Sequence, residues 1–452
     1  MRLGLSQIRD SVKQVIDQAA IYAVLAKIAS LGVNFGTLLL IAHYLSDVER
    51  GFYLTFYSII ALQVFFELGL GSILIQYAGH EFAHLNWNAT NQIEGNIYHR
   101  HRYYSLIRLT VKWYAVMALL FALVLTPVGL VFFNLHNDMQ PAHWRMAWIT
   151  LVVITALNLY LSPLLSLLEG AGKVASVARV RLVQSIAGAA FGWSAMTMGL
   201  GLWAAPAITC ATFLVSLIWL TKHFWQVLKT ALYTVIDQLD HQISWSQEIL
   251  PMQWRIGLSW MSGYLIYQLF NPIVFYQQGA TMAGKMGLSM AMVNALATLA
   301  ASWYATRIPA VAHLIARQQT HEAVHLFKRT TIITTLFLII ITLSALVFYQ
   351  ELIALYPAIA DKFLDTHALI ILMAAIIANH IISCQAAFTR TFKQEPYLYY
   401  SLVMAVLTLL IVFFGVRLLG INGMLGLYLA LMILVALPFS TLTFRSFMRQ
   451  RL

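Results

Sequence analysis

The stretch YLSDVERGFYLTFYSIIALQVFFELGLGSILIQYAGHE, residues Tyr44–Glu81, decides the fold class. A short polar turn ends at Gly51, and a run of about 26 residues follows to Tyr77, which exceeds the roughly 20 apolar residues that cross a bilayer as a helix. Glu67 stands inside this run, where a carboxylate costs about 2.5–3.5 kcal/mol unless it faces protein or water. The stretch therefore predicts a membrane-spanning helix with one polar side.

The composition of the whole chain supports this interpretation. Of its 452 residues, 60% are apolar and only 10% are charged, whereas a soluble domain carries about 25% charged residues. The 28 Lys and Arg exceed the 17 Asp and Glu, and in a membrane protein such an excess marks the cytoplasmic face, so it does not indicate nucleic acid. Cys210 and Cys384 both lie inside predicted spans, so neither a disulfide scaffold nor a thiolate metal site is expected.

Hydrophobic runs of about 18 or more residues predict membrane-spanning helices. The first six are Ile21–Tyr44, Phe52–Tyr77, Trp113–Phe133, Met146–Leu168, Leu182–Leu200 and Leu202–Leu220. The second six are Ile256–Phe275, Met286–Tyr304, Thr331–Phe348, His367–Phe388, Leu398–Val416 and Ile421–Phe444. The sequence thus predicts an all-α polytopic membrane protein with twelve transmembrane helices, in which only Gly199 to Gly201 separates the fifth span from the sixth.

The distribution of basic residues predicts the orientation. One set of alternate loops and both termini hold 22 of the 28 Lys and Arg, and Lys27 lies within the first span. The other set holds five: Arg50, Arg145, Lys285, Lys362 and Arg417. Because loops rich in Lys and Arg stay in the cytoplasm, we expect both termini to be cytoplasmic.

The chain also divides into two similar halves. A shift of 233 residues places Gly51 on Gly284 and brings the first two spans onto the seventh and eighth. We expect an N-lobe over 21–225, a cytoplasmic linker over 226–250 and a C-lobe over 251–452, related by a pseudo-two-fold axis along the membrane normal. Residues 1–20 read as an amphipathic helix on the cytoplasmic membrane surface or, alternatively, as a frayed tail.

Several motifs carry a family resemblance. Gly51, the aromatic run after it, Glu67-Leu68-Gly69-Leu70 and Gln76 resemble the first helical hairpin of the multidrug/oligosaccharidyl-lipid/polysaccharide exporter superfamily. FFELGLGSILIQYAGHE and Glu395-Pro396 look most like its polysaccharide-biosynthesis branch, the lipid-linked oligosaccharide flippases. The resemblance implies a two-lobed transporter of the bacterial inner membrane. Its motif content is confined to about Gly51–Glu81, and the second half lacks the acid-x-Gly-Leu element.

Polar residues within the spans recur at helical spacing. Asn34, Asn158, Asn294 and His380 belong to such stripes on the first, fourth, eighth and tenth spans. We expect these four residues to line a watered cavity and contact substrate, although each could instead hold helices together. Lys27 and Glu67, on neighbouring helices, are candidates for an ion pair, either static or opened during transport.

Basic residues near the cytoplasmic ends of spans are candidate phosphate ligands. The group consists of Arg179, Arg181, Arg255, Arg307 and Arg390. A guanidinium replaces water around a pyrophosphate through paired donors, so these residues suit a pyrophosphate-linked sugar. The alternative is ordinary contact with lipid headgroups. Arg307 and Arg390 are the preferred pair, because each extends a stripe that is already polar.

The sequence argues against other kinds of site. His80, His84, His99 and His101 cluster in one loop, but no Cys or grouped acids complete a metal shell, so a headgroup-facing basic loop is preferred. No phosphate-binding Gly-x-x-x-x-Gly-Lys loop or nucleophile elbow occurs, which argues against an ATPase or hydrolase. We therefore expect no enzyme activity, no cofactor, no metal and no nucleic acid.

Three functions remain to be weighed. The preferred function is flipping of a lipid-linked (polyprenyl-pyrophosphate) oligosaccharide across the membrane for surface polysaccharide synthesis. The partners that this function implies are membrane lipids and a polysaccharide polymerase or glycosyltransferases. The alternative in the same superfamily is a cation-coupled multidrug antiporter, whose cavity would need more acids than Glu67 and Glu169. A membrane-bound glycan polymerase or ligase is disfavoured, because the outer loops are short.

Overall fold

The computed structural model describes residues 32–88, 90–135, 138–234, 242–356, 361–392 and 394–451. Among these residues, eight helices are long and apolar enough to cross a membrane, and the bent pair Asp47–Glu67 and Leu70–Phe82 adds a ninth if it counts as one span. One of the eight, Leu398–Arg449, is 52 residues long and holds the eleventh and twelfth predicted spans. The all-α, multi-pass membrane fold is therefore confirmed, and the helices are broadly consistent with twelve spans. Lys27 and the predicted segment 1–20 lie outside the described residues.

The chain forms two compact units that exchange segments. Among the described residues, unit 1 comprises 32–44 together with those of Ile60–Trp260, and unit 2 comprises Leu45–Ile59 together with those of Met261–Leu452. The first part of the second predicted span therefore packs with residues of the second half of the sequence. The first part of the seventh predicted span packs with residues of the first half.

Unit 1 is built mainly from the first half of the sequence. Residues 32–44 are helical. The following elements are the 3-10 turn η1 (Ala61–Gln63), α3 (Val64–Glu67), α4 (Leu70–Phe82), β1 (Leu85–Trp87), β2 (Ile93–Gly95), α5 (Ile97–Phe133), α6 (Pro141–Gly170), α7 (Val174–Thr197), the 3-10 turn η2 (Gly201–Trp203), α8 (Ala204–His223), α9 (Trp225–Tyr233) and the π-helix η4 (Trp245–Ile249). The helix α10 (Leu250–Tyr267) begins in unit 1 and ends in unit 2.

Local chemistry sets the ends of the two longest helices of unit 1. The side chain of Asn96 caps α5 by accepting a hydrogen bond from the Tyr98 amide at 2.9 Å. Pro141 begins α6, where its missing N–H costs no helical hydrogen bond. The two helices pack through aromatic rings, with Trp148 5.4 Å from Phe133 between ring centroids. These contacts bury a large apolar area and fix α5 against α6.

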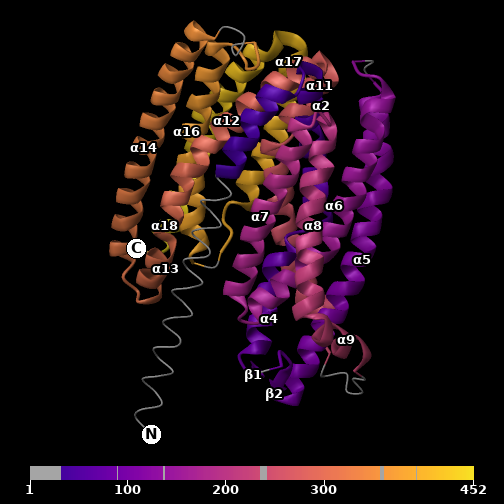
Figure 1. Cartoon of the computed structure of the whole chain (residues 1–452). Coiled ribbons are helices and arrows are strands. Elements are labelled where there is room, and N and C mark those ends of the chain that lie inside the picture. Colours follow the sequence, from indigo (N-terminus) through magenta and orange to yellow (C-terminus); the bar gives the residue numbers. More distant parts are fainter. Residues whose placement is uncertain are drawn as a thin grey trace. The chain divides into compact units, whose positions relative to one another are not determined.

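The histidine-rich loop after α4 folds into a small hairpin. Strands β1 and β2 pair antiparallel, with Asn86 opposite Glu94. The hairpin is fixed to the turn between α6 and α7, because the Trp87 indole N–H donates to the Ala171 carbonyl at 2.8 Å. The Lys173 ammonium lies 4.7 Å from the Trp87 ring centroid. Figure 1 shows β1, β2 and α9 at the same end of the long helices α5 and α6.

Unit 2 is built mainly from the second half of the sequence. Its elements are α2 (Asp47–Ile60, which belongs to this unit except for Ile60), α11 (Phe270–Gln278), α12 (Ala280–Ala305), α13 (Ile308–Ala316), α14 (Thr320–Leu355), α16 (Thr366–Arg390), α17 (Leu398–Ala430), the π-helix η5 (Leu431–Ala436) and α18 (Leu437–Arg449). Helix α17 contains a break at Gly420, whose φ of 69° is not helical. This break separates the eleventh predicted span from the twelfth.

The start of α2 crosses the start of α12 at very close range. A Cβ added to Gly51 would fall on the Ala280 carbonyl, and one added to Gly284 would lie 3.1 Å from the backbone carbonyl oxygen of Asp47. Asp47 and Gly51 lie 233 residues before Ala280 and Gly284. The two helices therefore meet at equivalent positions of the predicted repeat, and small residues let their backbones approach.

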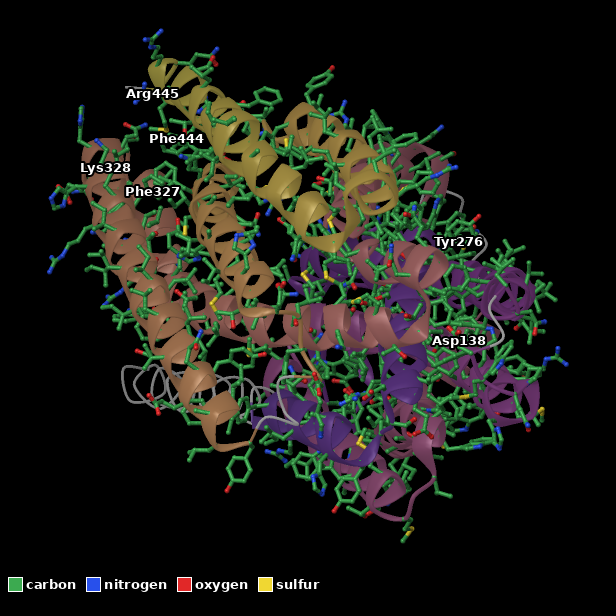
Figure 2. The ribbon with its side chains drawn as sticks, turned by 90° about the horizontal axis from the view of Figure 1, so that it is seen from above. Asp138, Tyr276, Phe327, Lys328, Phe444 and Arg445 are labelled. Carbon is green, nitrogen blue, oxygen red and sulfur yellow. The ribbon has the colours of Figure 1, made fainter. Side chains whose placement is uncertain are left out.

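Aromatic rings hold together the start of α14, the end of α16 and α18 in unit 2. Phe327, Phe388 and Phe444 form the centre of this cluster, and Phe327 is 5.1 Å from Phe444 between ring centroids. Figure 2 shows Phe327 and Phe444 side by side, with the neighbouring Lys328 and Arg445 toward the outside. Apolar side chains thus face one another while the adjacent cations face away, as in an amphipathic helix end.

Candidate functional site

The second predicted span is broken next to its carboxylate. Helix α3 ends at Glu67, and Leu68 and Gly69 both take left-handed backbone angles, with φ of 49° and 66°. The chain resumes as α4 after a bend of 43°. A non-glycine residue in this region typically costs about 1–3 kcal/mol, and such strain clusters at functional sites. The predicted span over Phe52–Tyr77 is therefore present as a bent pair of helices, and the break within it was not predicted.

Helix α10 packs over the break. A Cβ on Gly69 would fall on the Ile256 side chain, and a Cβ on Gly257 would lie 3.0 Å from Leu68 Cδ2. Two glycines thus allow the broken span to contact α10 closely. The Leu68 side chain is fixed against α10, which explains how a leucine is held in a backbone conformation that it rarely adopts.

Glu67 is half-buried at this break. Its carboxylate makes no hydrogen bond or ion pair with any other residue in the described ranges. The adjacent Phe66 ring packs edge-to-face on Phe121, at 5.4 Å between centroids. Lys27 lies outside the described residues, so its pairing with Glu67 stays a prediction. A carboxylate within a span is a candidate for ion or proton coupling.

A second polar feature lies in unit 2, where α2, α11 and α12 meet the end of α10. A cavity of about 170 Å³ opens there, which we call the amide pocket. Its polar lining residues are Tyr57, Ser58, Tyr267, Gln268, Asn271 and Asn294. Apolar residues such as Phe270 complete the wall, and none of the described lining residues is charged.

Asn271 is the most constrained group of the amide pocket. It is only 6% exposed, and its Nδ2 donates to Thr55 Oγ1 at 3.5 Å. Its Oδ1 is buried and has no hydrogen-bond partner among the described residues. A buried polar atom without a partner costs about 1–3 kcal/mol, and a ligand donor would remove that cost. Tyr267, nearby, is fixed by donating to Asn379 Oδ1 at 2.7 Å.

The structure places the predicted neutral site residues in different surroundings. Asn294 lines the amide pocket. Asn158 Nδ2 donates to the Thr209 carbonyl of α8 at 3.0 Å, so it connects two helices of unit 1. His380 is buried, with its Nε2 3.0 Å from Thr334 Oγ1. Asn34 is exposed on the helical segment 32–44. The structure brings only Asn294 of these four into the pocket.

The predicted basic residues are exposed and lie outside the amide pocket. Arg181 pairs with Glu169 at 2.7 Å, and Arg390 pairs with Glu395 at 2.9 Å. Arg255 lies over the Trp254 ring, 5.5 Å from its centroid. Arg307 is exposed at the start of α13, and Arg179 is exposed on α7. Their role as phosphate ligands stays a prediction.

Sequence reasoning missed the amides at the break of the seventh span. Helix α10 ends at Tyr267 and α11 begins at Phe270, so Gln268 and Asn271 lie at the junction. The signal was present as two amides and Pro272 within an otherwise apolar run. A proline and amides inside a span mark a place where the helix can open and expose polar groups.

A buried ionic cluster lies at the hairpin end of unit 1, and we call it the Glu81 cluster. Glu81, whose side chain is only 3% exposed, accepts hydrogen bonds from His99 Nδ1 at 2.8 Å and Arg102 Nε at 2.9 Å. Arg102 also pairs with Glu248 of η4 at 2.5 Å. The cluster therefore ties the segment before α10 to α4 and α5. The described residues include no group of three or more metal-binding side chains suited to an ion.

Comparison with known proteins gives matches in structure only. No family model matches the chain, and no curated protein is matched by its sequence. An inward-facing multidrug resistance MATE family transporter of the MOP superfamily matches with a TM-score of 0.61 and 13% identity, over 95% of both chains.

Two further solved structures extend this comparison. The lipid II flippase MurJ, in an inward closed conformation, matches with a TM-score of 0.66 and 10% identity, over 96% of this chain and 90% of that one. A MOP superfamily transporter from Pyrococcus furiosus matches with a TM-score of 0.60 and 13% identity, over 97% and 96%. The chain therefore has the two-lobed fold of MOP superfamily transporters.

Proposed function

We propose that this protein flips a lipid-linked oligosaccharide across the bacterial inner membrane by alternating access between two lobes. The MOP superfamily fold supports a transporter, and the lipid II flippase MurJ shares that fold. The observation that carries the substrate class is the amide pocket, whose polar groups are amides and hydroxyls. Arg307 and Arg390 remain our candidates for the pyrophosphate end of the substrate.

The chemistry of the amide pocket suits sugars better than cations. Sugar hydroxyls both donate and accept hydrogen bonds, and so do the amides of Gln268, Asn271 and Asn294. Aromatic groups such as Tyr57 and Tyr267 supply a flat surface beside these amides. An organic cation would gain most from a carboxylate, and no described lining residue supplies one. The buried Asn271 Oδ1 would accept a hydrogen bond from a sugar hydroxyl.

The second candidate function is cation-coupled export of organic cations. The observation that favours it is Glu67, a half-buried carboxylate with no partner among the described residues. The MATE family transporter with the same fold is described as a multidrug resistance protein. Under this alternative, Glu67 would bind the coupling cation or the drug, and the amide pocket would be secondary.

We expect Asn271→Leu to lower the rate of glycolipid flipping by about tenfold, because one lost hydrogen bond with an unpaired partner is worth about 1.4 kcal/mol or more. Purified protein in proteoliposomes would be assayed with a fluorescent polyprenyl-pyrophosphate oligosaccharide. Asn134→Leu, on an exposed turn of unit 1, is the matched control and should leave the rate unchanged.

The same proteoliposomes distinguish the two candidate functions. Asn271→Asp adds a carboxylate to the pocket, so it should also slow flipping without creating transport of a lipophilic cation. If the parent protein instead exchanges a lipophilic cation, moves no glycolipid and loses the exchange in Glu67→Gln, the antiporter is the function. Unchanged flipping by Asn271→Leu would remove the amide pocket from the path of the substrate.

We also propose that the protein lies in the inner membrane with both termini in the cytoplasm. The 22 Lys and Arg on one side against five on the other support this orientation. Reporter fusions after Gly79, Lys173 and Lys229 should be cytoplasmic, and fusions after Asn137 and Lys362 should be external. A single reversed reporter would contradict the order of spans at that point.

A further inference from the structure

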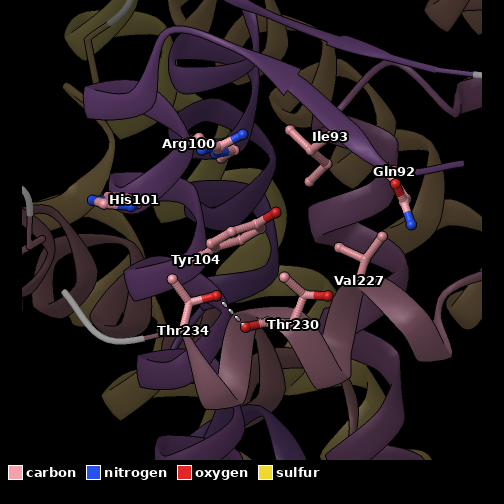
Figure 3. Close-up of a pocket in the computed structure, with 8 residues that line it drawn as sticks. All are labelled: Gln92, Ile93, Arg100, His101, Tyr104, Val227, Thr230 and Thr234. Carbon is pink, nitrogen blue, oxygen red and sulfur yellow. Dashed lines mark hydrogen bonds between the residues drawn. The ribbon is translucent and has the colours of Figure 1, made fainter.

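A cavity of about 310 Å³ lies between the start of α5, the hairpin and α9, all in unit 1. Its lining residues are Gln92, Ile93, Arg100, His101, Tyr104, Val227, Thr230 and Thr234. Figure 3 shows Tyr104 between Arg100 on one side and Thr230 and Thr234 on the other. We propose that this α5–α9 pocket binds the phosphate headgroup of an anionic membrane phospholipid.

The polar groups of the pocket are suited to an anion. The Arg100 guanidinium and the hydroxyls of Tyr104 and Thr230 make no hydrogen bond with another described residue. Thr234 Oγ1, in contrast, donates to the Thr230 carbonyl at 2.6 Å, as Figure 3 shows. No described lining residue is acidic. A guanidinium and two hydroxyls on one cavity form a donor set that fits a phosphate group.

Neighbouring charged groups are already satisfied and do not compete for the pocket. Arg108 donates to the carbonyls of Ala231 and Thr234, so it holds the last turn of α9. Glu94 accepts a hydrogen bond from Asn88 Nδ2 at 2.9 Å on the hairpin. Arg100, which makes no side-chain hydrogen bond with a described residue, is therefore a cation available to a ligand.

The apolar part of the pocket and the outer face of α9 indicate a lipid. Ile93 and Val227 are buried, with 4% and 3% exposure, and form an apolar wall beside the cations. On the outside of α9, Trp225 and Tyr233 are 56% and 78% exposed, and Leu232 is also exposed. Exposed Trp and Tyr on a short amphipathic helix are typical of the membrane interface. A lipid with a phosphate headgroup matches both the polar groups of the pocket and these apolar surfaces, whereas a free anion matches only the polar groups.

The test is a titration of the full-length protein in neutral detergent with short-chain phosphatidylglycerol, read from the thermal unfolding midpoint. Arg100→Gln should weaken the apparent affinity about fivefold, because a basic residue at an anionic lipid surface contributes about a factor of five. Thr230→Val, which keeps the shape of the side chain, should also weaken it. Arg317→Gln removes an exposed cation from unit 2 and should leave the affinity unchanged.

Matched ligands test the chemistry of the proposal. Phosphatidylcholine, inorganic phosphate and pyrophosphate should give no shift that depends on Arg100, and raising the salt concentration should weaken the phosphatidylglycerol effect. Equal affinity of Arg100→Gln and the parent for phosphatidylglycerol would overturn the site. An Arg100-dependent shift produced fully by phosphate or pyrophosphate alone would overturn its assignment to a phospholipid. The comparison between lipids within each variant separates binding from any general loss of stability.

Discussion

Replacing Gly51 by alanine is expected to lower the free energy of unfolding by about 3 kcal/mol or more, because overpacking a close contact costs about 1–3 kcal/mol and here the clash is with backbone. The added Cβ would fall on the Ala280 carbonyl, which belongs to the helix itself and cannot rotate away. Helices α2 and α12 would have to separate. Reversible unfolding in mixed micelles would measure the change, and the amount of protein in the membrane should fall with it.

Two further glycines make this experiment quantitative. In Gly284→Ala the new Cβ would lie 3.1 Å from the backbone carbonyl oxygen of Asp47, so the free energy of unfolding should fall by only about 1 kcal/mol. In Gly263→Ala nothing lies within 4 Å, and alanine favours a helix by up to about 1 kcal/mol, so stability should stay or rise. If Gly51→Ala and Gly263→Ala are equally stable, the described crossing of α2 and α12 is incorrect.

The second large effect is expected from Glu81→Gln, which should lower the free energy of unfolding by about 3 kcal/mol. Removing one member of a buried ion pair leaves the other charge unpaired, which costs about 3–5 kcal/mol. Arg102 loses its bond to Glu81 but keeps Glu248, so the lower end of that range applies. The carboxamide also fits poorly between two donors, His99 Nδ1–H and Arg102 Nε–H.

The same substitution at an exposed pair is the control for Glu81. Glu395→Gln breaks the pair with Arg390, in which both side chains are more than 40% exposed, so a change below about 1 kcal/mol is expected. Chemical unfolding of both variants in the same detergent gives the comparison. A Glu81→Gln variant that loses no more than Glu395→Gln would mean that the Glu81 cluster contributes little to holding η4 on unit 1.

The positions of the helices could largely be predicted from the sequence, because length and hydropathy control membrane insertion. Trp113–Phe133 lies within α5, and Thr331–Phe348 lies within α14. The break at Leu68 could not be predicted in this way, since the hydrophobic run continues beyond it to Tyr77. Contact with Ile256 and Gly257, nearly 190 residues later in the sequence, holds Leu68 in its conformation.

The candidate site was predictable only in part, for a different physical reason. Helical spacing shows which polar residues share a face, but it does not show what that face meets. Asn294 meets a cavity, whereas Asn158 meets the Thr209 carbonyl of α8. The surface ion pair of Arg390 could have been predicted from the sequence, because Glu395 follows Arg390 by only five residues.

The exchange of segments between the two units has a consequence for biosynthesis. Residues 45–59 leave the ribosome long before α12, which starts at Ala280 and forms their closest contact. At a synthesis rate of about 5–20 residues per second, α2 would remain in the membrane for tens of seconds before α12 covers the face that contains Gly51. Unit 1 is also incomplete without Leu250–Trp260 of α10. The first six spans made alone would therefore carry two unfinished surfaces, and we expect such a truncated chain to be held by insertion factors or degraded.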